Sequence, residues 1–216
     1  MAWTAVALAA DLGVGDVAGT RIDGEEIALW RDAGGTPHAF EDRCPHRGMR
    51  LSFGFARGDR LACLYHGWQF DGAGRCRAIP AHPDLSPPAT ITLRRHRCVE
   101  RAGLLWVAFA EAPPPADAPA WPVLSLFLDR PATTREPWRE RIAGTPLLLA
   151  PQPRSPTQSA WHVVALAPPA DAAALRAALH ARRRALERFA DEQPAASERR
   201  HAMAGSSHLR SAREAG

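Results

Sequence analysis

Two short segments of the chain each offer one thiolate and one imidazole as metal ligands. The first holds Cys44 and His46, and the second, sixteen residues further on, holds Cys63 and His66. These ligand types suit zinc or iron, whereas magnesium and calcium prefer oxygen. Structural zinc sites usually pair Cys with Cys and His with His. The mixed pairs fit better an iron–sulfur centre with two unequal irons, one held by the two cysteines and the other by the two histidines.

The sequence around these ligands resembles the N-terminal Rieske domain of the Rieske non-haem iron oxygenases, of the phthalate dioxygenase and vanillate demethylase type. The resemblance covers residues 26–110, and its matching segments are Arg31-Asp32, Phe40–Gly48, Leu51–Gly54, Cys63–Asp71, Gly74–Cys76 and Ile79-Pro80. It implies a Rieske-type [2Fe-2S] cluster whose ligands are Cys44, His46, Cys63 and His66. It also implies four further residues around the cofactor, which are Gly48, Tyr65, Gly67 and Trp68.

The residue types in these loops predict particular roles. Two neutral imidazoles in place of two thiolates raise the reduction potential to roughly −150 to +300 mV. We expect His46 and His66 to be the exposed ligands, on the side where an electron reaches a partner. Gly48 and Gly67 are expected to let the loops close over the cluster and to offer N–H donors, and Trp68 to pack beneath the second loop.

Residues 22–110 read as a series of short strands, because alternating or apolar runs are divided by turn residues. Residues 26–31 and 37–40 flank a Gly-Gly turn, and further strands are expected at 59–63, 68–70, 90–93, 97–100 and 104–109. The predicted fold is mainly β: a Rieske-type antiparallel β-sandwich with cluster-binding loops, followed by a small α+β C-terminal segment with one long helix.

Four parts of the chain are expected. They are a Rieske domain at 1–110, a Pro-rich connector at 111–141, a small α+β segment at 142–193 and a mobile tail at 194–216. Consecutive prolines cannot join a ladder or a helix, which places the connector. In the third part we expect strands at 145–150 and 160–166. A helix is expected from about Ala172 to Ala190, with Asp171 as its N-cap and one apolar stripe; the stripe comprises Leu175, Leu179, Leu186 and Phe189.

Composition narrows the possible classes of protein. The chain has 216 residues, 46% hydrophobic and 23% charged, which excludes a fully disordered or fibrous chain. No apolar run is long enough to cross a membrane, and no basic helix face or aromatic-bearing basic sheet favours nucleic acid. Four cysteines in a chain of this length argue against a disulfide scaffold. We therefore expect a cytoplasmic protein.

Charge is unevenly distributed along the chain. All 27 basic residues are Arg, and residues 43–60 hold five of them against Asp59 alone. Because this basic stretch spans the cluster loops, we hypothesise that it steers an acidic redox partner by electrostatic attraction.

One motif of Rieske oxygenases is not found in this sequence. Their mononuclear iron is held by two His and one carboxylate, introduced by a D/N-x2-H-x4-5-H pattern. The nearest match places Glu198, His201 and His208 at a longer spacing within the tail. We therefore assign no catalytic residues and consider oxygenase activity doubtful.

These observations predict a Rieske iron–sulfur protein of the oxidoreductase type that transfers one electron, as a carrier or accessory component related to Rieske oxygenases. The expected partners are a reductase or ferredoxin as electron donor and an oxygenase as acceptor, and neither nucleic acid nor a membrane is expected as a partner. Two alternatives stay open. One is a ring-hydroxylating or demethylating oxygenase whose iron site is atypical or completed by a partner. The other is a redox- or iron-sensing binding protein.

Overall fold

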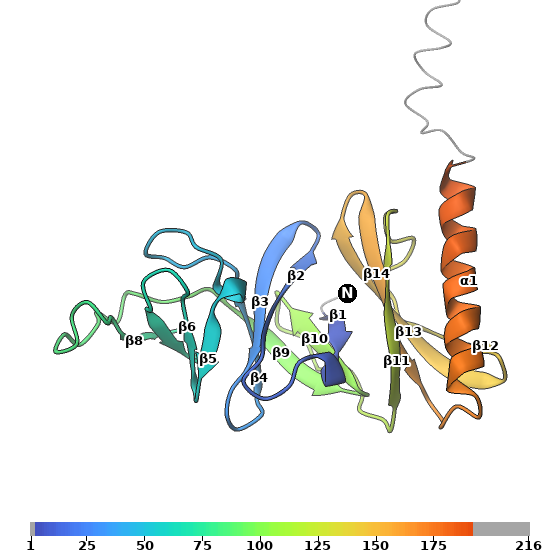
Figure 1. Cartoon of the computed structure of the whole chain (residues 1–216), viewed down its shortest axis with the longest axis horizontal. Helices are drawn as coiled ribbons and strands as arrows, with labels where there is room; N and C mark the ends of the chain where they lie inside the picture. Colours follow the sequence, from blue (N-terminus) through green and yellow to red (C-terminus); the bar gives the residue numbers. More distant parts are fainter. Residues whose placement is uncertain (1–2, 192–216) are drawn as a thin grey trace, which may run out of the picture.

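Alternating and apolar runs build a central antiparallel sheet of six strands. The computed structural model describes residues 3–191. The strand order in this sheet is β1 (Trp3–Leu8), β10 (Leu104–Ala108), β9 (Arg95–Arg101), β4 (Pro37–Glu41), β3 (Glu25–Arg31) and β2 (Val17–Ile22). Strands β3 and β10 are the most apolar because both of their faces are covered: Ile27, Trp30 and Leu104 are fully buried. Burial on both faces makes this sheet the middle layer of the molecule (Figure 1).

A smaller sheet carries the two segments with metal-binding residues. It is formed by β5 (Phe55–Arg57), β6 (Arg60–Ala62), β7 (Gln69–Asp71) and β8 (Cys76–Ala78), each paired with the next in antiparallel register. Leu61 and Phe70 face each other across β6 and β7 and are fully buried. They join Trp30 and Phe40 of the central sheet in one hydrophobic core. This core holds the small sheet at one end of the molecule.

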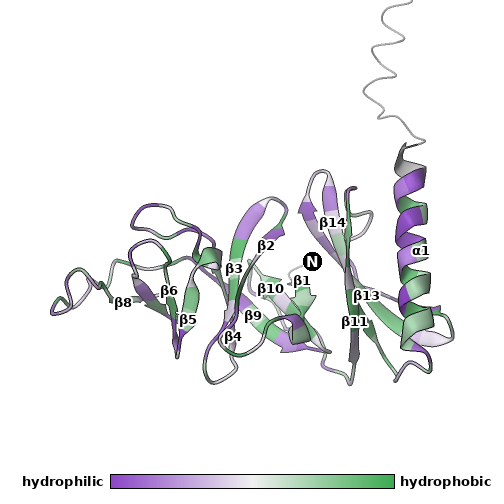
Figure 2. Ribbon diagram, in the orientation of Figure 1, coloured by the Kyte–Doolittle hydropathy of each residue, from purple (hydrophilic) through white to green (hydrophobic). Residues whose placement is uncertain are grey.

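A third sheet and the long helix form the other end (Figure 1). The strand order is β11 (Trp121–Leu128), β14 (Gln158–Ala165), β13 (Thr145–Ser155) and β12 (Trp138–Ile142). Helix α1 (Ala172–Asp191) packs on this sheet through Leu175 and Leu179, both fully buried. Figure 2 shows its alternating apolar and polar surfaces. Asp171 accepts a hydrogen bond from the Ala174 N–H at 2.8 Å, as expected for an N-cap.

The fold is mainly β with antiparallel sheets and one long C-terminal helix, as the sequence predicts. The third sheet is larger than expected, because residues 111–141 contain β11 and most of β12 instead of forming only a connector. Proline did not prevent this, since β11 is an edge strand and its register shifts at Pro122. The strand expected at 90–93 is reduced to a single bridge between Thr92 and Arg75.

Two further expectations concern the ends and surfaces of the chain. The tail at 194–216, with Glu198, His201 and His208, lies outside the described residues. Within the described part of the chain, no helix is long and apolar enough to cross a membrane.

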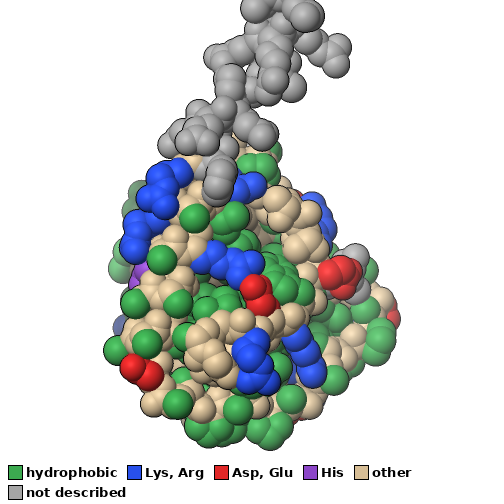
Figure 3. Space-filling view, turned by 90° about the vertical axis from the view of Figure 1, so that its right-hand side faces the viewer, with side chains coloured by type: hydrophobic (Ala, Val, Ile, Leu, Met, Phe, Trp, Pro, Cys, Tyr) green, Lys and Arg blue, Asp and Glu red, His purple; other side chains and the backbone are tan. Residues whose placement is uncertain are grey.

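Figure 3 views the molecule from the α1 side, where arginine side chains are spread among apolar ones. On α1, Arg182 is paired with Glu140 and Arg183 with Glu187.

Candidate metal centre

The two ligand-bearing loops have the same backbone geometry. In the first loop the Cys44 N–H donates to Met49 O, and the Gly48 N–H donates to Cys44 O, both at 2.8 Å. In the second loop the Cys63 N–H donates to Trp68 O at 2.9 Å, and the Gly67 N–H donates to Cys63 O at 3.0 Å. Each turn therefore closes on its cysteine and presents the histidine two or three residues later.

Gly48 and Gly67 are required by this geometry. Their φ angles are +73° and +69°, a region that residues with a Cβ rarely adopt. A Cβ on Gly67 would also lie 3.0 Å from Pro80 Cγ. Both glycine N–H groups donate to the cysteine carbonyls, and their expected donation to a cluster stays a prediction.

The structure brings the two cysteines together and buries them. Each has 2% of its surface exposed. Burial, with a smaller contribution from the adjacent Cys63, raises the pKa of Cys44 to about 11. A thiolate at this buried pair of cysteines needs a nearby cation to compensate its charge. An iron held between them would supply that charge, so the pair fits a metal-binding role.

The two histidines face each other nearer to solvent. Their ring centroids are 4.6 Å apart, His66 is exposed, and His46 is half-buried. His46 Nδ1 is buried without a hydrogen-bond partner, as expected of a nitrogen that awaits a ligand. Burial lowers the pKa of His46, and the neighbouring charges of His66 and Arg47 contribute. The neutral imidazole, which is the metal-binding form, is therefore favoured.

Aromatic rings surround the two imidazoles. Trp68 stacks on His46, with centroids 4.5 Å apart and an interplanar angle of 3°. Trp68 was expected to pack beneath the second loop, but its ring instead contacts His46 and so joins the second loop to the first. Tyr65 lies over His66 with centroids 3.8 Å apart. The rings fix the orientation of both imidazoles without occupying their nitrogens.

The four side chains form two pairs of different type. Cys44 and Cys63 are buried, whereas His46 and His66 meet nearer to solvent. A two-iron cluster that takes two cysteines on one iron and two histidines on the other would use such a division. Among residues 3–191, no group of three or more His, Cys, Asp or Glu side chains is placed to hold one metal ion.

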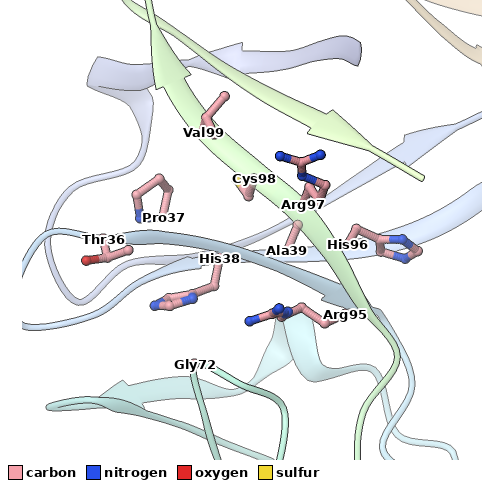
Figure 4. Close-up of a pocket in the computed structure, with 10 residues that line it drawn as sticks. All are labelled: Thr36, Pro37, His38, Ala39, Gly72, Arg95, His96, Arg97, Cys98 and Val99. Atoms are coloured by element: carbon pink, nitrogen blue, oxygen red, sulfur yellow. The ribbon is translucent and has the colours of Figure 1, made fainter. Parts of the chain in front are cut away.

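The small sheet is positioned against the central sheet by His38. Figure 4 shows His38 and Arg95 extending from β4 and β9 toward Gly72, beside a cavity of about 290 Å³, whereas His96 points away. His38 stacks on Trp30, and its Nε2 lies 2.9 Å from Asp32 Oδ2. A Cβ on Gly72 would lie 2.4 Å from His38 Cε1, so only glycine allows this approach. No motif in the sequence indicates this contact.

A polar network remote from the two loops is also not marked by any sequence motif. His162 is buried, with Nδ1 2.9 Å from Ser125 Oγ and Nε2 2.9 Å from Gln152 Oε1. Gln152 is separated from its other partner, Thr20, by 132 positions in the chain. No local motif marks such a network, because its members come from strands far apart in the sequence.

Comparison with known proteins agrees with the geometry of the loops. Residues 2–92 match the Rieske [2Fe-2S] domain family. The chain is 38% identical over 112 residues to the oxidoreductase NdmD of Pseudomonas putida, covering 51% of this chain and 19% of NdmD. It is 42% identical over 126 residues to the 4beta-methylsterol monooxygenase of Methylococcus capsulatus, covering 56% of this chain and 33% of that protein. The chain thus matches no more than a third of either relative.

Solved structures share the fold over a longer range. Dicamba monooxygenase bound to dicamba aligns with a TM-score of 0.62 and 21% identity over 90% of both chains. NdmA of Pseudomonas putida aligns with a TM-score of 0.64 and 20% identity over 82% of this chain and 76% of that one. The family match implies a Rieske-type [2Fe-2S] cluster. Residues 2–92 are therefore similar to the Rieske [2Fe-2S] domain, and the matched relatives include a 4beta-methylsterol monooxygenase and the oxidoreductase NdmD.

Proposed function

We propose that this chain transfers single electrons, as a carrier or accessory component related to Rieske oxygenases. The observation that carries the proposal is the arrangement of the four proposed ligands. Cys44 and Cys63 are buried, whereas His66 is exposed and His46 is half-buried beside it. An electron entering or leaving has the shortest path to solvent on the histidine side.

The protein's own residues prepare this site for a cluster. When bound, the cluster supplies reversible one-electron reduction at a moderate potential. The buried cysteines bind it as thiolates and keep water from the sulfur side. His46 and His66 hold the outer side, and the rings of Trp68 and Tyr65 keep their orientation. Because these parts are held by packing and turns, the protein around a bound cluster would need little rearrangement when an electron is gained or lost.

The proposed partners are a reductase or ferredoxin as donor and an oxygenase component as acceptor. Among the relatives, NdmD is named an oxidoreductase and NdmA a methylxanthine N1-demethylase, so both kinds of component occur among proteins similar to this chain. We place the protein in the cytoplasm because none of its four cysteines forms a disulfide.

The test is the metal content of anaerobically purified protein. We expect two irons and two acid-labile sulfides per chain. Cys44→Ser and Cys63→Ser should lose both, whereas Cys76→Ser and Cys98→Ser, which alter the other two cysteines, should keep them. His46→Cys should retain a cluster with a lower potential, because a thiolate adds negative charge. It should also lose one of two nitrogen couplings in the electron spin resonance of the reduced protein.

Two results would contradict the proposal. One zinc per chain without sulfide would mean that the loops form a structural site. A third iron that disappears in His201→Ala or His208→Ala would instead indicate an oxygenase with a mononuclear iron.

A further inference from the structure

A small cavity lies between the central sheet and the third sheet, away from the cluster loops. Its volume is about 170 Å³. Its apolar wall is formed largely by side chains of the central-sheet region, which are Val6, Leu12, Ala18 and Leu29. Three polar or charged side chains from the third sheet also line it, namely Ser125, His162 and Arg154. An apolar cavity of about 150 Å³ holds a molecule the size of benzene, so this one admits a small ligand.

The hydrogen-bond network fixes what Ser125 presents to the cavity. Gln152 Nε2 lies 2.6 Å from the backbone carbonyl of Arg21. A carbonyl oxygen can only accept a hydrogen bond, so the Gln152 atom beside it is the amide nitrogen, which donates. The amide oxygen of Gln152, Oε1, then accepts a hydrogen bond from His162 Nε2–H. Nδ1 is then unprotonated and accepts from the Ser125 hydroxyl, 2.9 Å away. With its proton engaged, Ser125 Oγ offers the cavity only lone pairs, and it will accept from a ligand donor.

His162 stays neutral near pH 7, so the hydrogen-bond directions among Gln152, His162 and Ser125 hold there. Burial lowers the pKa of His162 to about 3, and the positive charge of Arg154 contributes. Arg154 and His162 line the same cavity. The neutral tautomer, and with it the acceptor character of Ser125, is therefore the stable state.

Arg154 supplies an uncompensated positive charge. The ion pairs among residues 3–191 do not include it, and its guanidinium carbon lies 5.0 Å from the centroid of the Phe127 ring. Burial lowers the pKa of Arg154, with a further contribution from the charge of Arg21. Because a half-buried guanidinium without a carboxylate is costly, an anion at this end of the cavity would be stabilised.

Asp11 adds an acceptor of the opposite charge at the rim. It is exposed, ends the short helix Ala9–Asp11, and lines the same cavity. The cavity is therefore lined by the cation of Arg154, by the carboxylate of Asp11 together with the neutral acceptor Ser125 Oγ, and by an apolar wall. We propose that this cavity binds a small zwitterion with an apolar side chain, an aliphatic α-amino acid such as leucine or valine, with its carboxylate at Arg154 and its ammonium at Ser125 and Asp11.

The test uses L-leucine and two analogues that each lack one charge, 4-methylpentanoate and 3-methylbutylamine. Binding to the full-length, cluster-loaded protein is followed by ligand-observed saturation-transfer NMR. We expect L-leucine to bind more tightly than either analogue. Arg154→Gln should weaken L-leucine binding by about tenfold or more, and Ser125→Ala by about threefold, since hydrogen bonds to charged groups are involved. Arg139→Gln and Ser155→Ala are matched controls outside the cavity and should leave binding unchanged.

The analogues separate the two ends of the cavity. Asp11→Asn should weaken L-leucine and 3-methylbutylamine but leave 4-methylpentanoate unaffected. Ala18→Val, which narrows the cavity from its apolar wall, should reduce binding of all three. Far-ultraviolet circular dichroism and the visible spectrum of the cluster verify that each variant is folded. The proposal fails if L-leucine shows no saturable binding, or if Arg154→Gln and Arg139→Gln bind it equally. Neither result affects the proposed electron transfer, which is tested by metal content.

Discussion

Two groups of polar residues matter in this protein: the proposed cluster ligands and the buried residues that join the sheets. The proposed ligands could be recognised from the sequence because each Cys and His pair lies within four positions of the chain. Ser125, Gln152 and His162 could not, because their hydrogen bonds link three strands of the third sheet and reach β2 of the central sheet. Only the folded topology brings these groups together.

His162 should make the stability of the protein depend on pH. Its folded pKa is about 3, whereas an unfolded histidine titrates near 6.5. As the pH falls from 7 to 5, the unfolded state takes up a proton that the folded state does not. The free energy of unfolding should therefore decrease by about 2 kcal/mol over this interval from His162 alone. Stability above pH 7 should be unaffected by this group.

Thermal unfolding of wild type and His162→Gln at pH 7 and pH 5 measures this contribution. The variant should be less stable at pH 7, because Ser125 loses its acceptor, but it should lose less stability on acidification than wild type does. His180→Gln, at an exposed position of α1, serves as the control and should behave as wild type. Equal losses in wild type and His162→Gln would show that His162 is not buried in its neutral form.

At the scale of elements, the approach of the two ligand loops depends on a glycine outside both of them. Gly54 lies between the short helix Leu51–Phe53 and β5, and a Cβ there would lie 2.2 Å from the carbonyl oxygen of Ala62. Ala62 precedes Cys63 directly. The close contact between Gly54 and Ala62 therefore sets the distance between the first loop and the second.

Gly54→Ala should separate the loops. We expect a loss of stability of about 3 kcal/mol, because a backbone carbonyl cannot move aside as a flexible side chain does. Iron content should fall with it. Gly58→Ala is the matched comparison, since Gly58 has a φ of +64° but open space around it. It should cost about 1 kcal/mol and leave the iron content unchanged. Full iron content in Gly54→Ala would show that the loops tolerate the displacement.

Helices and strands could be predicted from the sequence where residues close together in the chain specify them. The N-cap at Asp171 and the stripe through Leu175 and Leu179 identify α1 because a helix is specified by contacts three or four residues apart. Strand β11 was missed because it begins with Trp121 and Pro122 directly after a Pro-rich run. Its place is determined by pairing with β14, more than thirty positions later in the chain.

At the scale of the whole molecule, the turn between β2 and β3 joins the Rieske domain to the third sheet. The Asp23 N–H donates to Pro153 O and the Gly24 N–H to Arg154 O, both at 2.8 Å. The Asp23 carboxylate receives two hydrogen bonds from Arg135, at 2.6 and 2.8 Å. The backbone of Arg154 is thus fixed from the central sheet while its side chain lines the amino-acid cavity. Any ligand held there would contact both halves of the molecule.

The distribution of charge around the cluster predicts how a redox partner approaches. Arg43 and Arg47 are exposed beside Cys44 and His46, whereas Arg57 lies at the far end of the β5–β6 hairpin and Arg50 is paired with Glu26. The basic run in the sequence is therefore divided in space, and only part of it faces the histidines. An acidic partner should be steered by this part, with an attraction that falls as salt shortens the Debye length.

Stopped-flow reduction by an acidic plant-type [2Fe-2S] ferredoxin tests this expectation. The second-order rate constant should fall as ionic strength rises, because screening weakens the attraction between unlike charges. Arg47→Gln should slow the reaction severalfold at low salt and little at high salt, whereas Arg57→Gln, a substitution of the same charge away from the histidines, should have a smaller effect. The rate of reduction by a neutral mediator should not depend on ionic strength, on Arg47→Gln or on Arg57→Gln. A rate constant independent of salt, or equal effects of the two substitutions, would mean that the arginines beside His46 do not guide the donor and that apolar contacts around Tyr65 determine docking.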